Sequence, residues 1–419
     1  MKKERFESNI ESSKVFSLGV LLAVFVFWLF HFFTRSAYID TYFITDHHDT
    51  SMDYFNMLAN LNHADPWYAN ANYPAICFLF WKVMHRFLPY ADYSDGFTLR
   101  ENMIAQLGYF LFILICIIII WEVIQNVAKG SKTEKTLFSA ALLFSGPMFF
   151  VLERGNILLA VLAFSMLFLA LYDSEKFWLR VIAYVALSIA AAIKLYPAVL
   201  GLLVLWKKRY KETALLIVLG ASAFFLPFFV FDGIDSLIKM LGGIVVATEV
   251  QTGLGLGCNY CLSNFIQMIA ALFGDNLQRV PGWVPVLGAV GCLGLFFISN
   301  CEWQKLYALV LLCIWYPTFS YTYTLVLLFL PILSFFFRNE KEKQKKSSLF
   351  YTISFVMLVI PYALPMVDRI NNALQLDYVK FPVSWGMLII NAMLGVIAVV
   401  IAIENCVRIM KNRSQRMTK

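Results

Sequence analysis

Long apolar runs alternate with short polar stretches along the whole chain. A helix that crosses a bilayer needs about 20 mostly apolar residues, because in hydrocarbon only its own hydrogen bonds satisfy the backbone. Runs that approach or reach this length lie at about Val15–Phe33, Met103–Trp121, Leu137–Leu152, Ile157–Leu171, Phe177–Trp206, Ala214–Phe231, Val284–Ile298, Leu306–Trp315, Tyr323–Phe337, Phe350–Leu364 and Trp385–Ile403. The pattern therefore predicts an all-α integral membrane protein that forms a polytopic helix bundle.

The basic residues indicate which side of the membrane each loop faces, because loops rich in Lys and Arg stay in the cytoplasm. The first run follows several basic residues and has no small-residue cleavage site, so we expect an uncleaved anchor. Further basic clusters lie at Lys129–Lys135, Lys207–Lys211, Arg338–Lys346 and Arg408–Lys419. With a cytoplasmic N-terminus, every cluster falls inside, provided that Phe177–Trp206 crosses an even number of times.

The run Phe177–Trp206 is ample for one helix but short for two full passes of about 20 residues each. A single pass would place the basic cluster that begins at Lys207 on the outside. We therefore expect a broken pair of helices that turns at Lys194-Leu195-Tyr196-Pro197, where Pro197 interrupts the helical hydrogen bonds. The prediction is about twelve crossings in one polytopic domain, 1–419, with both termini cytoplasmic.

On this topology, the polar segments between the runs gather on the outer side. They are an outer-face loop with interfacial helices at 34–102, the turn Glu153–Asn156, the break at Lys194, the stretch Tyr316–Tyr323, and a second outer-face loop at 232–283. The basic loop 338–347 is cytoplasmic. We expect the functional site where these outer segments converge.

Composition agrees with the membrane prediction. Apolar residues make up 60% of the 419 residues and charged residues 15%, whereas soluble proteins have about 25% charged residues. The net charge of +7 suits a basic inner face and requires no nucleic acid as a partner. Most of the eight cysteines lie in apolar runs and act as small hydrophobic residues. Cys258 and Cys261 are compatible with an outer-face disulfide, but we favour chance spacing.

The outer loop contains an acidic segment, Asp46-His47-His48-Asp49-Thr50-Ser51-Met52-Asp53. Helical spacing would put Asp46, Asp49 and Asp53 on one face. Three interpretations are open: a solvated loop, a site for Zn²⁺ or Mn²⁺, or a catalytic base that takes a proton from an attacking hydroxyl. The other outer loops offer no comparable ligands, which argues against a metal.

Two further features accompany the acidic segment. After Tyr73-Pro74, the stretch Ala75–Leu88 is too short to span and carries basic residues, which indicates an interfacial helix or simple packing. Arg154 and Lys194 stand at helix ends, where they either snorkel or bind a phosphate and stabilise its negative charge.

The order of motifs resembles glycosyltransferase family 87. The resemblance rests on Glu153-Arg154-Gly155-Asn156, an apolar helix, and Ala190-Ala191-Ala192-Ile193-Lys194-Leu195-Tyr196-Pro197 before Lys207-Lys208-Arg209. The earlier Asp-Tyr-Phe, Asp-Pro-Trp-Tyr and Tyr-Pro elements follow the same order, so the resemblance covers about Tyr38–Pro331. It implies a GT-C-like membrane enzyme that takes a sugar from a polyprenyl-phosphate donor on the outer leaflet.

The resemblance also implies site residues. The catalytic aspartate follows the first membrane helix, and both Asp49 and Asp53 match; we prefer Asp49. Some members place a His on a late outer turn, where this chain has Ser320 and two tyrosines, which puts a His-assisted mechanism in doubt. The candidate substrate-binding residues are Arg154, Asn156, Lys194, Tyr196, His48, Tyr73, Tyr321 and Tyr323.

The implied reaction is an inverting transfer, with an acceptor hydroxyl attacking as the phosphate leaves. The expected partners are the polyprenyl-phosphate sugar donor, a lipid-linked or cell-envelope glycan acceptor, and the bilayer of the plasma membrane, with no cofactor and no metal. A transporter or flippase would show midplane charges and paired inverted repeats, and we find no internal repeat. A polysaccharide polymerase is the other alternative, and such enzymes usually rely on Arg and His in late outer loops.

Overall fold

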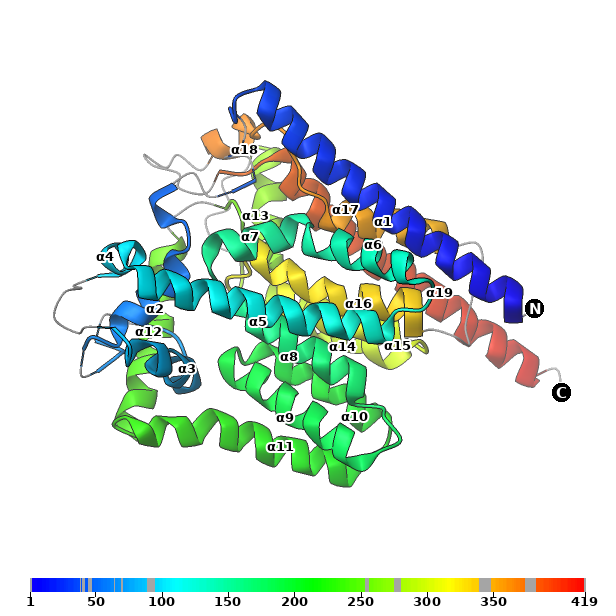
Figure 1. Ribbon diagram of the computed structural model, residues 1–419. Coiled ribbons are helices and arrows are strands. Elements are labelled where there is room, and N and C mark those ends of the chain that lie inside the picture. The colour runs from blue at the N-terminus through cyan, green and yellow to red at the C-terminus, as the bar shows by residue number, and fades with distance from the viewer. Residues whose placement is uncertain are drawn as a thin grey trace. The chain divides into compact units, whose positions relative to one another are not determined.

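The computed structural model describes residues 2–37, 39, 42–43, 47–63, 65–68, 71–88, 95–252, 256–274, 280–338, 348–373 and 382–417. The chain forms two compact units, each built from separate stretches. Unit 1 comprises residues 1–45, 124–148 and 255–419, and unit 2 comprises residues 46–123 and 149–254. Figure 1 labels the helices of both units.

Unit 2 contains the elements that position the candidate site. They are η2 (His47–Asp49), α2 (Met52–Asn60), α3 (Ala75–His85), α4 (Gly96–Glu101), most of α5 (Met103–Val127), the end of α7 (Gly146–Arg154), α8 (Leu158–Leu171), α9 (Phe177–Ile193), η3 (Tyr196–Gly201), α10 (Leu202–Trp206), α11 (Tyr210–Phe225), η4 (Leu226–Val230) and α12 (Ile234–Thr252). The outer loops of the sequence prediction therefore contain several helices.

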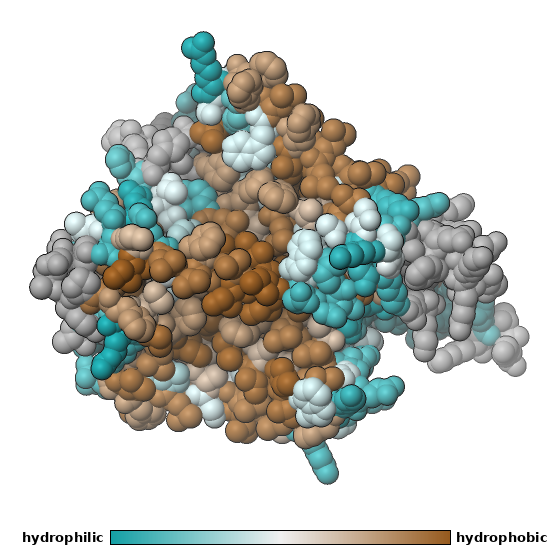
Figure 2. Space-filling view, in the orientation of Figure 1, coloured by the Kyte–Doolittle hydropathy of each residue, from teal (hydrophilic) through white to brown (hydrophobic). Residues whose placement is uncertain are grey.

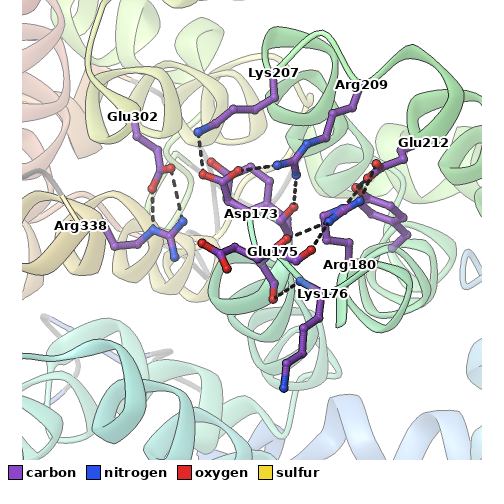
Figure 3. A network of polar contacts seen from close by, with 12 residues as sticks. Asp173, Glu175, Lys176, Arg180, Lys207, Arg209, Glu212, Glu302 and Arg338 are labelled. Carbon is purple, nitrogen blue, oxygen red and sulfur yellow. Dashed lines mark hydrogen bonds and ion pairs between the residues drawn. The ribbon is translucent and has the colours of Figure 1, made fainter. Parts of the chain in front are cut away.

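Unit 1 is helical as well. Its elements are α1 (Lys2–Phe33), α6 (Lys132–Leu143), α13 (Leu262–Leu272), α14 (Trp283–Ile298), α15 (Glu302–Trp315), η5 (Thr322–Leu328), α16 (Phe329–Leu333), η6 (Ser334–Arg338), α17 (Ser348–Val359), α18 (Asp368–Ala373) and α19 (Trp385–Met417). The centre of its core is α15, which is buried along most of its length. Its first residue, Glu302, pairs with Arg338 at 2.6 Å (Figure 3).

The all-helical prediction is confirmed, since the described residues form helices and turns with only two isolated β-bridges. Four described helices are long and apolar enough to cross a membrane: Glu11–Phe33, Met103–Val127, Tyr210–Val230 and Trp385–Gln415. The bent pair Lys132–Leu143 and Gly146–Arg154 would make a fifth. The other apolar helices have 10–17 residues and fall short of the length that a full crossing needs. The predicted twelve crossings are not confirmed.

Several helices present apolar side chains outward. In unit 1, α1 exposes a stripe that includes Leu18, Leu22 and Phe25. In unit 2, α5 exposes Phe110 and its apolar neighbours, and α11 exposes residues such as Ile217. Figure 2 shows how widely apolar residues cover the visible face. Because large exposed apolar surfaces mark interaction with membranes or other proteins, these faces fit a protein embedded in lipid.

The run from Phe177 to Trp206 is broken where the sequence predicts it. Helix α9 ends at Ile193, and the 3-10 helix η3 begins at Tyr196 with a proline in its first turn. Helix α9 lies against α8 on one side and α11 on the other (Figure 1). Pro197 has no N–H to continue the α-helical ladder, which explains the break.

A network of charged side chains joins the two ends of this run (Figure 3). Asp173, just before α9, pairs with Lys207 at 2.6 Å and with Arg209 at 2.9 Å. Arg180 in α9 donates to both oxygens of Glu212 in α11, at 2.8 and 2.9 Å. The chain therefore leaves this end along α9 and returns to it through η3 and α10, which confirms the predicted broken pair.

The Cys258–Cys261 motif has a structural role rather than a disulfide. Neither cysteine takes part in a disulfide. Cys261 precedes α13, and its Sγ accepts a hydrogen bond from the backbone N–H of Asn264 at 3.4 Å. It therefore caps one of the unpaired N–H groups at the start of that helix.

Candidate functional site

Helices α8 and α9 run antiparallel and bring two candidate residues to the same end of unit 2. Asn156 stands just before α8, and Lys194 follows the last residue of α9. The fourteen residues of α8 span about 21 Å, which separates this end from the Asp173 network. Asn156 caps α8, because its Oδ1 accepts a hydrogen bond from the N–H of Leu158 at 2.9 Å.

The turn before α8 requires a glycine. Gly155 has a φ of +64°, and a Cβ built on it would lie 3.1 Å from the carbonyl oxygen of Ser51. The backbone N–H of Ser51 in turn donates to the carbonyl of Glu153 at 2.6 Å. The backbone of the turn Glu153–Asn156 thus packs directly against the backbone of the acidic segment. A side chain at position 155 would prevent this contact, which explains the Gly between Arg154 and Asn156.

The acidic segment is not one continuous helix, so the prediction of a single helical face is wrong. Asp49 ends the short 3-10 helix η2, and Asp53 lies in the first turn of α2. Between them Ser51 adopts a left-handed conformation with φ 62°, which breaks the helical repeat. Asp46 lies outside the described residues.

Arg154 nevertheless brings the two aspartates together. Its Nη2 lies 2.7 Å from Asp53 Oδ1, and its Nη1 lies 3.6 Å from Asp49 Oδ2. The same Nη1 donates to the backbone carbonyl of Asp49 at 2.8 Å. The Arg154 side chain is only 10% exposed, and hydrogen bonds between charged partners in such a setting are strong and directional. One guanidinium therefore holds the position of both carboxylates.

The Asp53 carboxylate accepts hydrogen bonds from two side chains, those of Arg154 and Asn156. Asp53 accepts a second hydrogen bond, from Asn156 Nδ2 to Oδ2 at 2.7 Å, so each of its oxygens faces a donor of this chain. Asp49 has the longer contact to Arg154, and its side chain is 24% exposed against 19% for Asp53. Asp49 is thus the more accessible carboxylate.

Lys194 is the second cation at this end. Its ammonium nitrogen lies 4.6 Å from the centre of the Tyr73 ring, a cation–π contact. Burial lowers the pKa of Lys194, and the nearby Cys77 and Asp53 act against that shift. Among the described residues no carboxylate lies within ion-pair distance of its ammonium. Its charge is therefore not matched by a direct partner, in contrast to that of Arg154.

Tyr73 lies next to Lys194 and close enough to Arg154 and Asp53 for both to act on it electrostatically. Burial raises the pKa of Tyr73 well above its usual value, and the nearby Asp53 carboxylate raises it further. The ring therefore stays a neutral phenol that can donate a hydrogen bond. The backbone carbonyl of Tyr73 accepts from Trp67 Nε1 at 2.9 Å, and Trp67 packs in a cluster with Phe78 and Phe228, which fixes the segment.

The other predicted residues divide between the two units. Tyr196 begins η3 and is close enough to Tyr73 to act on it electrostatically. His48 lies in η2 and is exposed; its backbone carbonyl accepts a hydrogen bond from Arg100 at 2.7 Å. Tyr321 and Tyr323 belong to unit 1, with their rings 5.6 Å apart.

Three residues that were not among the predicted site residues support this arrangement. Arg100 in α4 bonds the carbonyls of His48 and Thr50. Tyr109 in α5 donates to the carbonyl of Leu152 at 2.5 Å. Glu153 accepts from Thr50 at 3.2 Å, while its other oxygen is buried without a hydrogen-bond partner among the described residues. Of the three, only Glu153 could be noticed in the sequence, because it directly precedes Arg154.

The interpretation of the acidic segment as a metal site gains no support from the part of the chain that the structure describes. No group of three His, Cys, Asp or Glu residues there has an arrangement that could hold a metal ion. Arg154 instead supplies the positive charge between the two aspartates.

Residues 97–331 match the model of glycosyltransferase family 87. The match covers more than half of the chain and includes Arg154, Asn156 and Lys194, whereas Asp49 and Asp53 precede it. No curated protein and no solved structure gives a significant match. The predicted resemblance is confirmed, and the chain belongs to glycosyltransferase family 87.

Proposed function

We propose that this protein is an inverting membrane glycosyltransferase. It takes a sugar from a polyprenyl-phosphate donor and transfers it to a lipid-linked or cell-envelope glycan acceptor. Membership of the family supports glycosyl transfer as the activity. The observation that carries the more specific proposal is the pairing, at one end of the α8–α9 hairpin, of an accessible carboxylate with a cation that lacks a matched anion.

In this proposal Asp49 is the general base. It accepts the proton of the acceptor hydroxyl as the hydroxyl oxygen bonds to the anomeric carbon. The bond between that carbon and the donor phosphate breaks, and its electron pair leaves with the phosphate oxygen. A single displacement of this kind inverts the anomeric configuration. The phosphate is a good leaving group without protonation, so the second carboxylate that glycosidases use as an acid is not required.

Lys194 is the cation that neutralises the departing phosphate. A positive charge placed where negative charge develops lowers the barrier most in a site that excludes water. Arg154 and Asp53 are positioning residues: the guanidinium and the Asn156 amide hold Asp53, and the same guanidinium sets the place of Asp49. Tyr73, Tyr196 and His48 line the approach of the substrates.

The proposed location of the site is the outer face of the plasma membrane, with both termini and the basic loops in the cytoplasm. The Asp173 network includes basic residues of the Lys207–Lys211 loop and lies at the far end of α8 and α9 from Lys194. Helix α3 exposes Phe80 and Val83 beside Lys82, as an interfacial helix does.

Cysteine labelling tests this orientation. In intact cells, a single cysteine at Lys208 should resist a membrane-impermeant maleimide, whereas a cysteine at Tyr68 should react. Both positions are exposed, so burial in the protein does not limit either reaction. Each variant must label fully in permeabilised cells as the control. Labelling at Lys208 from outside would contradict the orientation.

The donor class is tested with the purified full-length chain in detergent. Sugar transfer is expected from a short-chain polyprenyl-phosphate sugar and not from the corresponding nucleotide sugar, because the proposed site binds one phosphate with one uncompensated lysine. Transfer from the nucleotide sugar alone would contradict the proposed donor.

A further inference from the structure

The segment Phe319–Tyr323 of unit 1 places aromatic and polar side chains on opposite sides. Phe319, Tyr321 and Tyr323 are half-buried, whereas Ser320 and Thr322 between them are 1% and 2% exposed. Tyr321 has the extended backbone angles φ −65° and ψ 165°, and Thr322 and Tyr323 form the start of the 3-10 helix η5. The three rings therefore share the more exposed side.

The rings form a continuous surface, which we call the aromatic ladder. The rings of Phe319 and Tyr321 are stacked, with centres 6.3 Å apart and planes inclined by 25°. The Tyr321 and Tyr323 rings follow at 5.6 Å and 58°. Two of the three rings carry hydroxyl groups. The ladder thus combines flat apolar faces with hydrogen-bonding groups at its edge.

Hydrogen bonds to the loop that contains Asn259 fix the backbone of the aromatic ladder. The Asn259 Oδ1 accepts from the backbone N–H of Ser320 at 2.9 Å. The backbone of Tyr260 donates to the Ser320 carbonyl at 2.7 Å, and that of Thr322 donates to the Cys258 carbonyl at 2.9 Å. Asn264 fixes the loop in turn, donating to the Asn259 carbonyl at 2.6 Å. These hydrogen bonds hold the backbone of the segment, so the three rings are in position before a ligand binds.

We propose that the aromatic ladder binds the pyranose ring of the acceptor glycan. A sugar ring presents a face of C–H groups, which packs on an aromatic ring, and an edge of hydroxyls, which bonds to phenol groups. The ladder lacks a charged side chain of its own, so it suits a neutral sugar better than the phosphate of the donor. This assignment rests on the proposed function, because it takes a sugar as the acceptor.

Binding can be measured without turnover. Saturation-transfer NMR on the full-length chain in detergent micelles would use three probes, namely the methyl glycosides of glucose, galactose and mannose. We expect saturation of the ring C–H protons of at least one probe. Tyr321→Leu combined with Tyr323→Leu should weaken that signal about five- to tenfold, the loss expected for removed aromatic contacts.

Two controls separate the ladder from general effects. Tyr316→Leu removes a 54% exposed aromatic ring that lies before this segment, at the end of α15, and it should leave the signal unchanged. Tyr321→Phe with Tyr323→Phe keeps the rings and should retain most of the signal, which also tests folding. No saturation of any probe, or equal signals from the wild type and the double Leu variant, would overturn the assignment.

Kinetics then distinguish this assignment from the proposed function. If the wild type transfers sugar, the double Leu variant should raise the acceptor KM about five- to tenfold and leave the donor KM unchanged. An unchanged acceptor KM would reject the ladder and leave the proposed function intact. Saturation of a probe without any transfer by the wild type would reject the proposed function and keep the sugar site.

Discussion

Replacing Asp49 by Asn should lower the turnover number at least about 100-fold, the usual share of general-base catalysis. The amide has nearly the same shape as the carboxylate but cannot take a proton from the acceptor hydroxyl. The carbonyl of Asp49 that accepts from Arg154 belongs to the backbone, so the main anchor of this segment survives the change. Donor binding should also survive, because the proposed phosphate ligand is Lys194.

Asp53→Asn is the informative comparison. Its amide can still accept one hydrogen bond, but it meets two donors, Arg154 and Asn156, so one of the two contacts is lost. We expect a lower melting temperature, from a loss of about 1–3 kcal/mol, and a smaller fall in turnover than for Asp49→Asn. Asp65→Asn serves as a control, since Asp65 pairs with Lys239 and has no proposed part in the reaction.

The measurement is the initial rate of sugar transfer in detergent, with expression and melting temperature checked for each variant. Full activity of both Asp49→Asn and Asp53→Asn would remove the acidic segment from the chemistry and would require another residue as the base. A larger loss for Asp53→Asn in a protein of unchanged melting temperature would make Asp53 the base instead.

Lys194→Met should lower kcat/KM for the donor about 10- to 150-fold, which corresponds to the 1.5–3 kcal/mol of a hydrogen bond to a charged group. Methionine keeps most of the side-chain volume against the Tyr73 ring but removes the charge. Donor hydrolysis or transfer at varied donor concentration gives the constant. The acceptor KM should stay the same.

Lys82→Met is the matched control. Lys82 also lies over an aromatic ring, that of Phe231 at 5.1 Å, but it is exposed on α3 and has no proposed contact with the donor. Its removal should leave the donor constants unchanged. If Lys194→Met behaves like Lys82→Met, Lys194 only directs its ammonium towards the membrane surface and the phosphate site lies elsewhere.

The sequence predicted the break at Lys194 because local chemistry determines it. A proline after a long apolar run ends an α-helix wherever it occurs, and the basic cluster after Trp206 required the chain to turn back. The family motifs lay in the same region, so Arg154, Asn156 and Lys194 could be named as candidates. Their grouping follows from the antiparallel packing of two helices of similar length.

Other features depended on tertiary contacts that no local pattern reveals. The left-handed Ser51, which separates Asp49 from Asp53, has no sequence signal because serine rarely adopts that conformation. Arg100 and Tyr109 bind backbone carbonyls that are distant in sequence. The predicted count of about twelve crossings is also not confirmed, since a run of apolar residues does not reveal whether its helix stops early.

The most direct test of the proposed inverting transfer is the anomeric configuration of the product formed from a polyprenyl-phosphate sugar of known configuration. Purified wild-type protein, donor and an acceptor glycan extract are incubated, and the new glycosidic bond is assigned by NMR. We expect a product with the opposite configuration, together with free polyprenyl phosphate in equal amount. A product that retains the donor's configuration, or an absence of transfer from any polyprenyl-phosphate sugar, would contradict the proposed transfer.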